Sequence, residues 1–337
     1  MKILFSGHHN PHFTTITEYI ETAIQALGHE LYIFEDSKHI IPGRIRRFSS
    51  LLQKVNLNYI NKQLISLVAA VHPDITIISG GERITLETVQ KLKNYCANVV
   101  LWTIDAPINF ARLIQAAPAY HYIFCQGTEA IEIFERENIK GAKWLPMACD
   151  LIQHHPVQCS SQDKDKYGSD IVFVGSYYRN RAALFEKLVD LDIAIWGPGW
   201  EYLAPSSPLQ RKIRGRHMNP SEWLKIYSAS KIVLATHYQD PQKRFPVYQA
   251  SPRIFEALAC GAFVICDNQR DVFSLFKDRE HLACFYDEAD LMEKIKHYLD
   301  HSEERNVISA QGRQEAIAKH TYVHRIRKLL SIIGEHS

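Results

Sequence analysis

The stretch "SPRIFEALACGAFVICDN", residues 251–268, holds a complete helix-to-strand unit and decides the fold. Ser251 and Pro252 are typical of a helix start, because a serine hydroxyl accepts an orphan amide and proline has none to satisfy. Small residues let the helix pack closely on a sheet, Gly261 ends it, and "AFVICD" is typical of a buried strand. The pattern predicts one step of an α/β fold.

The same alternation of apolar strands and amphipathic helices runs along most of the chain, for example in "ITIIS" at 75–79 and in the helix predicted over 61–71. Such alternation predicts parallel sheets covered on both faces. It lapses over the polar stretch 150–169, where we predict an interdomain linker. We expect two doubly wound Rossmann-like domains, 1–155 and 165–318, facing a central cleft, and a C-terminal helix in 319–337 that packs back toward the first.

Composition excludes several classes of protein. The chain has 337 residues, a net charge of +2 and 46% hydrophobic residues, which is typical of a globular protein and gives no field for gathering nucleic acid. No apolar run reaches the roughly 18 residues of a membrane span, and "MKILFSG" is too short for a secretion signal. The seven cysteines form no CxxC pair and are expected to be buried free thiols. We therefore expect a cytoplasmic protein.

The first turn of the helix after Ser251 has the features of an anion site. Free backbone amides and the positive end of the helix dipole favour a diphosphate there, and Arg253 adds charge. Glu256 lies about one turn further along, where its carboxylate can accept both hydroxyls of a ribose. The alternative is an ordinary amphipathic helix with a surface Arg/Glu pair.

Two further strand-to-helix turns are candidates for ligand contact. "FVGSYYRNR" at 173–181 has glycine for close backbone approach and arginines that can neutralise phosphate. "WGPGW" at 196–200 can hold a flat base against backbone groups or Trp196. Either stretch can also be an ordinary turn.

The N-terminal half has polar residues at strand ends that are candidates for catalysis. Asp105, in "WTIDAP", follows a strand, where a carboxylate can deprotonate an attacking hydroxyl. His8 and His9 follow Gly7 in the first strand-to-helix loop, and Glu82 follows "SGG". Each can also be a plain loop residue.

Motifs for other chemistries are missing. The chain has no GxGxxG after a strand and no GxxxxGK[ST], which disfavours dinucleotide and P-loop sites. The acidic triplets at 163–165 and 190–192 lie in the polar linker and at a helix-to-strand junction. "HHNPH" at 8–12 lacks a helical pair of ligands. We expect no metal site.

Five stretches together carry a family resemblance. They are "FVGS", "IWGPGW", "NPSEWLKIYSASKIVLAT", "SPRIFEALACGAFVICDN" and "AQGRQEAIAKHTYVHRIRKLL". In this order they resemble the C-terminal domain of GT-B glycosyltransferases, in particular the CgeB-type branch of glycosyl transferases group 1. The resemblance covers about 170–330, and the N-terminal half is similar mainly through "WTIDAP" and "LPMACD".

The resemblance implies a sugar nucleotide bound chiefly by the second domain. Glu256 would contact the ribose. The diphosphate would lie on the 251–254 turn, with its residues Ser251, Arg253 and Ile254. Gly175, Ser176 and Arg179 would lie beneath the phosphates, and Trp196 and Gly197 near the base. Many retaining relatives have a second glutamate that contacts the donor sugar, and that position is Tyr248 here.

These observations predict a metal-independent glycosyltransferase without a cofactor. It would move a sugar from a nucleoside-diphosphate donor, preferably UDP-linked, to a hydroxyl of a glycan, lipid-linked or other acceptor. The alternatives are a GT-B sugar-nucleotide epimerase and a non-catalytic GT-B scaffold that binds a glycan or a partner protein. Basic clusters at 43–48, 211–217 and 324–330 are either solvated charge or contacts to an anionic acceptor or membrane surface.

Overall fold

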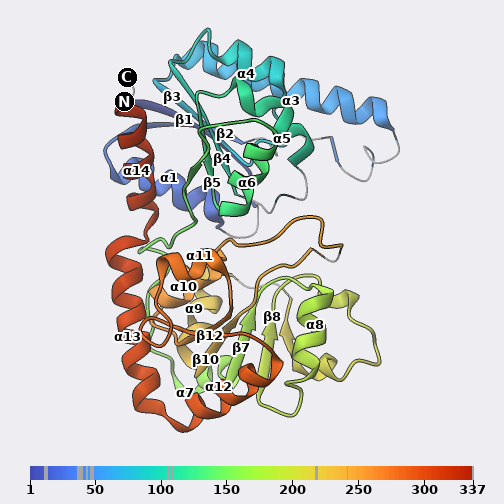
Figure 1. Cartoon of the computed structure of the whole chain (residues 1–337), viewed down its shortest axis with the longest axis vertical. Coiled ribbons are helices and arrows are strands. Elements are labelled where there is room, and N and C mark those ends of the chain that lie inside the picture. Colours follow the sequence, from blue (N-terminus) through green and yellow to red (C-terminus); the bar gives the residue numbers. More distant parts are fainter. Residues whose placement is uncertain are drawn as a thin grey trace. The chain divides into compact units, whose positions relative to one another are not determined.

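The computed structural model describes residues 1–10, 14–35, 41–42, 45, 49–104, 107, 110–216, 219–240 and 242–335. The chain forms two compact units (Figure 1). Unit 1 consists of Met1–Pro146 and Tyr322–Ser337, and unit 2 of Met147–Thr321.

Unit 1 is built on a six-stranded parallel sheet in the order β2-β1-β3-β4-β5-β6. The strands are β1 (Lys2–Gly7), β2 (Glu30–Glu35), β3 (Ile75–Ser79), β4 (Asn98–Thr103), β5 (Tyr122–Cys125) and β6 (Lys143–Trp144). The chain leaves β1 to one side for β2 and to the other for β3. In open parallel sheets such a switch point is where ligands bind, beyond the carboxyl ends of the two strands.

Six α-helices of the described residues belong to unit 1. They are α1 (Ile16–Ala26), α3 (Ser50–Val71), α4 (Leu86–Leu92), α5 (Phe110–Ala116), α6 (Thr128–Arg136) and α14 (Tyr322–Gly334). Helix α14 packs on helix α1, and the ring centroids of Tyr19 and Tyr322 lie 5.9 Å apart.

Helix α3 is longer than the sequence predicted. We expected a helix over 61–71, but it begins at Ser50, after Ser49 accepts a hydrogen bond from the Leu52 amide. The second half buries Leu64 and Val68 in the core. The first half buries only Asn56 and Ile60 and exposes Leu51, Val55 and Tyr59, so it lacks the periodic core-facing pattern by which a helix is predicted.

Unit 2 has a second six-stranded parallel sheet in the order β12-β11-β10-β7-β8-β9. The strands are β7 (Ile171–Val174), β8 (Ile193–Trp196), β9 (Ile213–Gly215), β10 (Ile232–Ala235), β11 (Val264–Asp267) and β12 (Ala283–Phe285). Here the switch point lies between β7 and β10. Both strands are fully buried, as their unbroken apolar sequences predicted.

Seven α-helices of the described residues belong to unit 2. They are α7 (Ser161–Tyr167), α8 (Arg179–Glu186), α9 (Pro220–Ala229), α10 (Pro252–Ala259), α11 (Arg270–Leu275), α12 (Glu288–Asp300) and α13 (Ser302–Lys319). The predicted linker over 150–169 therefore contains a helix, α7. It escaped prediction because Tyr167 is its only buried residue, while Ser160 and Asp163 form a capping box at its start.

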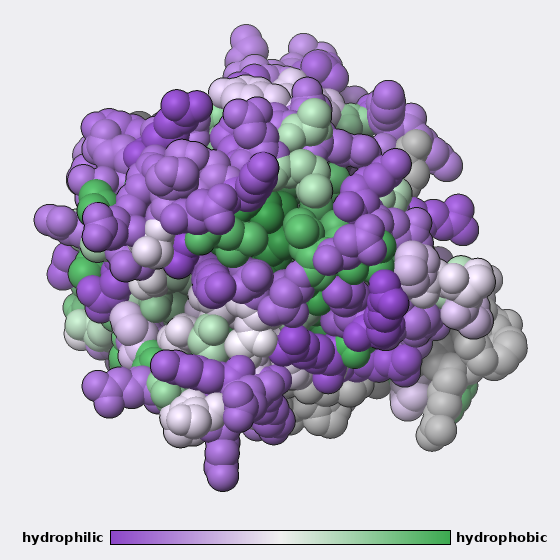
Figure 2. All heavy atoms as spheres, turned by 90° about the horizontal axis from the view of Figure 1, so that it is seen from below, coloured by the Kyte–Doolittle hydropathy of each residue, from purple (hydrophilic) through white to green (hydrophobic). Residues whose placement is uncertain are grey.

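The hydrophilic surface and the absence of disulfide bonds are what the composition of the chain predicted. The face in Figure 2 is mostly hydrophilic, with apolar side chains gathered in a hollow near its middle. None of the seven cysteines forms a disulfide bond and six of them are buried, as predicted. Among the described residues, no helix has the length and apolarity that crossing a bilayer requires.

Candidate functional site

The predicted donor-side residues meet at the switch point of unit 2. Arg253, in the first turn of α10, donates from Nε to the carbonyl of Val174 at the end of β7. Its Nη1 reaches the carbonyl of Thr236, which follows β10, at 3.4 Å. One guanidinium thus ties the helix start to both strands that flank the switch point.

Gly175 and Gly197 allow this packing. A Cβ at Gly175 would lie 2.2 Å from Arg253 Nη2, and one at Gly197 would lie 2.3 Å from the Gly175 carbonyl oxygen. Both glycines have positive φ, +156° and +132°. We expected glycine here for the approach of a ligand, and the structure shows that the two turns and Arg253 also need it to approach one another.

A second arginine, Arg181, is buried beside the first. It donates from Nη1 to the Ser176 carbonyl and from Nη2 to the Thr236 carbonyl, both at 2.8 Å. Burial, and then the charge of Arg253, lower the pKa of Arg181 to about 9. Neither guanidinium hydrogen-bonds a carboxylate of the described residues, so a bound anion would relieve the repulsion between them.

The sequence offered both arginines of 173–181 as phosphate ligands, and the family resemblance placed Arg179 beneath the phosphates. Arg179 is the first residue of α8 and is exposed, whereas Arg181 is buried. Residues two positions apart on a helix point to nearly opposite sides, so only one of these two arginines can face the core.

The carboxyl group of Glu256 is desolvated. Burial raises its pKa to about 7, an effect that the charge of Arg253 reduces in part. No described residue donates a hydrogen bond to this carboxylate. The side chain is only partly buried, so a ligand can reach the carboxylate and complete its hydrogen bonds.

The start of α10 is held by a histidine that the sequence analysis did not identify. The Ser251 amide donates to His237 Nε2 at 2.9 Å, and His237 Nδ1 lies 2.5 Å from Asp267 Oδ1 at the end of β11. The expected cap by the Ser251 hydroxyl is absent, so that prediction was wrong. The backbone of Ser251 is fixed instead by an imidazole ring.

Asp267 keeps its negative charge in this arrangement. Burial alone would raise the pKa of Asp267, but hydrogen bonds from His237 and from Gln269 hold it below the ordinary value. The carboxylate fixes His237 Nδ1 as the donor, which leaves Nε2 as the acceptor for the Ser251 amide.

The remaining donor-side residues lie around this centre. Ile254 is buried in α10, and Ser176 is partly buried after β7. Trp196 is buried at the end of β8 against Tyr167. Its carbonyl accepts from the Gly175 amide at 2.8 Å, and the Gly197 amide donates to the Gly215 carbonyl at 2.9 Å, so these backbone groups serve the packing of the two turns. Tyr248 is the residue that the resemblance aligns with the second glutamate of retaining relatives. The guanidinium carbon of Arg270 lies 3.8 Å from the centroid of the Tyr248 ring.

The acceptor-side residues occur at the switch point of unit 1. Gly7 ends β1 and is followed by His8 and His9, while Glu82 follows the neighbouring strand β3. A Cβ at Gly7 would lie 2.8 Å from Thr17, so glycine lets α1 pack against this strand end. Asp105 lies outside the described residues.

His9 has a buried acidic partner. Its Nε2 lies 2.9 Å from Glu21 Oε1 of α1, and burial raises the pKa of Glu21, an effect that His9 opposes. A histidine oriented by a carboxylate is an arrangement suited to moving a proton. His8, its neighbour, is exposed.

The acidic triplets have structural contacts. Asp163 caps α7 and pairs with Lys225 at 2.8 Å, and Asp192 accepts a hydrogen bond from the Asp170 amide at 3.0 Å. Among the described residues, no three His, Cys, Asp or Glu side chains are grouped so as to hold a metal ion.

Comparison with known proteins agrees with this architecture. Residues 179–331 match the family described as "Glycosyl transferase-like". Spore protein CgeB of Bacillus subtilis (strain 168) is 21% identical over 276 residues, covering 79% of this chain and 84% of that protein.

Solved structures share the fold over nearly the whole chain. Sucrose-phosphate synthase from Thermosynechococcus elongatus has a TM-score of 0.70 at 13% identity, covering 100% of both chains. HepE of Anabaena, in complex with UDP and glucose, has a TM-score of 0.65 at 12% identity, covering 99% of this chain and 100% of that one.

The two parallel sheets and these neighbours show the GT-B fold, and residues 179–331 are similar to the glycosyl transferase-like family.

Proposed function

We propose that this protein transfers a sugar from a nucleoside diphosphate, preferably UDP, to a hydroxyl of a glycan, lipid-linked or other acceptor. The observation that carries the proposal is the desolvated carboxylate of Glu256 beside Arg253 at the start of α10. A carboxylate and a cation at one helix start suit a ligand with hydroxyls at one end and phosphates at the other.

The diphosphate would lie against the backbone of 251–254 and the Gly175-Ser176 turn. Helix α10 contributes the positive end of its dipole there, and the arginine pair adds two positive charges within a desolvated environment. When the sugar leaves, negative charge grows on the diphosphate, so these groups would stabilise the transition state more than the bound donor.

The neighbouring structures give this proposal its donor. HepE of Anabaena has been seen with UDP, UDP-glucose and glucose, which are the reactants and leaving group of such a transfer. The arginine pair would balance the charge of the diphosphate without a divalent cation. The acceptor hydroxyl would be deprotonated by a group of unit 1, with Asp105 first and His8 or His9 next.

Titration calorimetry with UDP tests the donor site. We expect Glu256→Ala to weaken binding by roughly 1.5–3 kcal/mol, about ten- to a hundred-fold, because it removes a charged acceptor for ribose hydroxyls. Glu293→Ala, an exposed residue of α12, is the matched control and should bind like the wild type. Equal affinity of wild type and Glu256→Ala would remove Glu256 from the site.

Turnover assays separate the transferase from its alternatives. Slow hydrolysis of a UDP-sugar, accelerated by an acceptor, is expected of a transferase. Interconversion of the UDP-sugar without an acceptor would indicate an epimerase, and UDP binding with neither reaction would indicate a non-catalytic scaffold.

A further inference from the structure

Two guanidinium groups share one aromatic ring in unit 2. The guanidinium carbon of Arg253 lies 4.8 Å from the centroid of the Phe173 ring, and that of Arg181 lies 5.1 Å from the same centroid. A guanidinium within about 6 Å of a ring centroid is attracted by the negative charge on the face of the ring. The guanidinium of Arg181 also lies over a second ring, that of Tyr178, at 4.6 Å.

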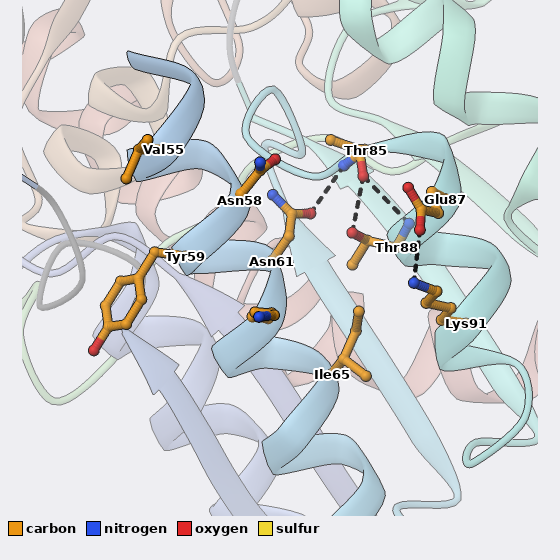
Figure 3. A pocket seen from close by; sticks show the side chains of 10 residues that line it. Val55, Asn58, Tyr59, Asn61, Ile65, Thr85, Glu87, Thr88 and Lys91 are labelled. Atoms are coloured by element: carbon orange, nitrogen blue, oxygen red, sulfur yellow. Dashed lines mark hydrogen bonds and ion pairs between the residues drawn. The ribbon is translucent and has the colours of Figure 1, made fainter. Parts of the chain in front are cut away.

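The usual partner of a cation in a protein is a carboxylate. Figure 3 shows such a pair in unit 1, where Lys91 Nζ lies 2.6 Å from Glu87 Oε1. Arg181 and Arg253 differ, because within the described part of the chain their hydrogen bonds go to backbone carbonyl groups alone. Aromatic rings therefore take the place of a counter-ion for this pair.

An aromatic ring and a carboxylate leave different charges for a ligand. A carboxylate would cancel the charge of an arginine, and an anionic ligand would have to displace it. A ring has no net charge, so it attracts both guanidiniums while their positive charges remain available to an anion.

Two carboxylates act on the pair through their charge, Asp267 on Arg181 and Glu256 on Arg253. Neither carboxylate lies within ion-pair distance of an arginine of the pair. Asp267 is bound by His237 and Gln269 instead. The charges of the arginines are therefore not neutralised by direct contact.

Phe173 has a fixed position beneath both arginines. It lies on β7, one residue before Val174, whose carbonyl accepts from Arg253, and its side chain is fully buried. A Cβ at Gly175 would lie 2.9 Å from the guanidinium carbon of Arg253 and 3.1 Å from Phe173 Cζ, so glycine lets the three groups approach one another. The ring holds the guanidiniums in place before any ligand binds.

We propose that Phe173 is a positioning residue of the donor site, whose ring holds the guanidiniums of Arg181 and Arg253 together for a diphosphate. The inference rests on the proposed function for the ligand that it serves. Without the ring, repulsion would separate the two cations, and the partly exposed Arg253 would turn toward solvent. An anion would then have to restore the order of the pair, which weakens its binding. Phe173 acts only through the arginines and does not itself contact the ligand.

Titration calorimetry of the full chain with inorganic pyrophosphate and with UDP tests this role. We expect Phe173→Leu to weaken the binding of both ligands roughly five- to thirty-fold, the range of one or two desolvated cation–π contacts. Phe185→Leu is the matched control, because Phe185 is equally buried and its ring centroid lies 4.8 Å from that of Phe173. It should lower the melting temperature to a similar degree and bind both ligands like the wild type.

Fluorinated phenylalanines introduced in place of Phe173 separate the charge of the ring face from its shape. Fluorine atoms withdraw negative charge from the face and change the size of the ring little. The affinity for pyrophosphate should therefore fall stepwise as fluorine atoms are added to the ring, whereas the same series in place of Phe185 should leave it unchanged. A role of Phe173 in packing alone predicts no such order.

The outcomes distinguish this inference from the proposed function. If the wild type binds pyrophosphate but not UDP, and Phe173→Leu binds pyrophosphate more weakly, Phe173 keeps its role and the proposed donor is wrong. If the wild type binds UDP and Phe173→Leu binds it equally well, the donor stands and the role of Phe173 is refuted. Equal weakening by Phe185→Leu, or an affinity that fluorination does not change, refutes that role too. Binding of neither ligand by the wild type overturns both.

Discussion

At the scale of single residues, the ionised carboxylate of Glu256 should lower the free energy of unfolding, although we propose that the same carboxylate binds the ligand. Its pKa is about 7 in the folded protein and 4.5 ordinarily, so between these pH values the folded state holds a proton that the unfolded state has lost. The free energy of unfolding therefore falls as pH rises through this window, and the full penalty of the desolvated carboxylate is present above pH 7.

Glu256→Gln should remove that penalty. We expect the variant to be more stable than the wild type at pH 8 by about 1–3 kcal/mol, with the difference shrinking toward pH 5, where the glutamate is protonated too. Urea unfolding at the two pH values measures this, with the exposed Glu293→Gln as control for loss of one charge. Equal stability of wild type and variant at pH 8 would mean that the carboxylate is not desolvated.

At the scale of elements, His237 is a positioning residue for α10. His237→Phe keeps a ring of similar size but loses the bonds to the Ser251 amide and to Asp267. We expect a loss of about 1–3 kcal/mol in unfolding free energy, because a buried amide and a carboxylate lose partners. UDP affinity should fall as well, since the helix start loses its anchor.

Asn61→Leu provides the matched control for this effect. Asn61 is buried in unit 1, donates to the Leu57 and Arg83 carbonyls at 2.7 and 2.8 Å, and accepts from the Thr85 amide at 3.1 Å. Its loss should destabilise the protein to a similar degree and leave UDP affinity unchanged. If both variants change affinity alike, His237 has only a structural role.

Elements whose signal is local were predictable from the sequence. The strands around 171–174 and 264–267 and the start of α10 at Pro252 follow from apolar runs and a proline at the first helical turn. The parallel sheets followed from the alternation of strands and helices. The first half of α3 and the whole of α7 were missed, because neither presents an apolar face to a core.

Contacts between distant segments were not predictable. His237 and Asp267 are thirty residues apart and meet only because β10 and β11 are neighbours in the sheet. From the local sequence, the Ser251 hydroxyl is expected to cap the helix. Nothing near it in the sequence indicates that its backbone amide will donate to His237 instead. The sequence offered Arg179 and Arg181 alike, because which of the two is buried depends on the packing of α8 against the rest of unit 2.

At the scale of the whole molecule, turnover should survive EDTA. The proposed site balances the diphosphate with Arg253, Arg181 and the helix start, so a chelator would remove nothing that the reaction needs. Initial rates with and without EDTA, on protein dialysed against metal-free buffer, measure this. Loss of activity that manganese restores would show that a cation is required.

The division of the chain into two units predicts that donor binding and turnover can be separated. The residues around Glu256 belong to unit 2, whereas Asp105 belongs to the sequence of unit 1. Asp105→Asn keeps the size and hydrogen-bonding capacity of the side chain but removes its charge. A general base at this position predicts a drop of roughly 10²-fold or more in the rate, with UDP affinity nearly unchanged. An aspartate that only supports its loop predicts a lower melting temperature and near-normal turnover per folded molecule. Rate, affinity and melting temperature measured on one preparation distinguish the two, and an unchanged rate would direct the same experiment to His9→Gln and then to His8→Gln.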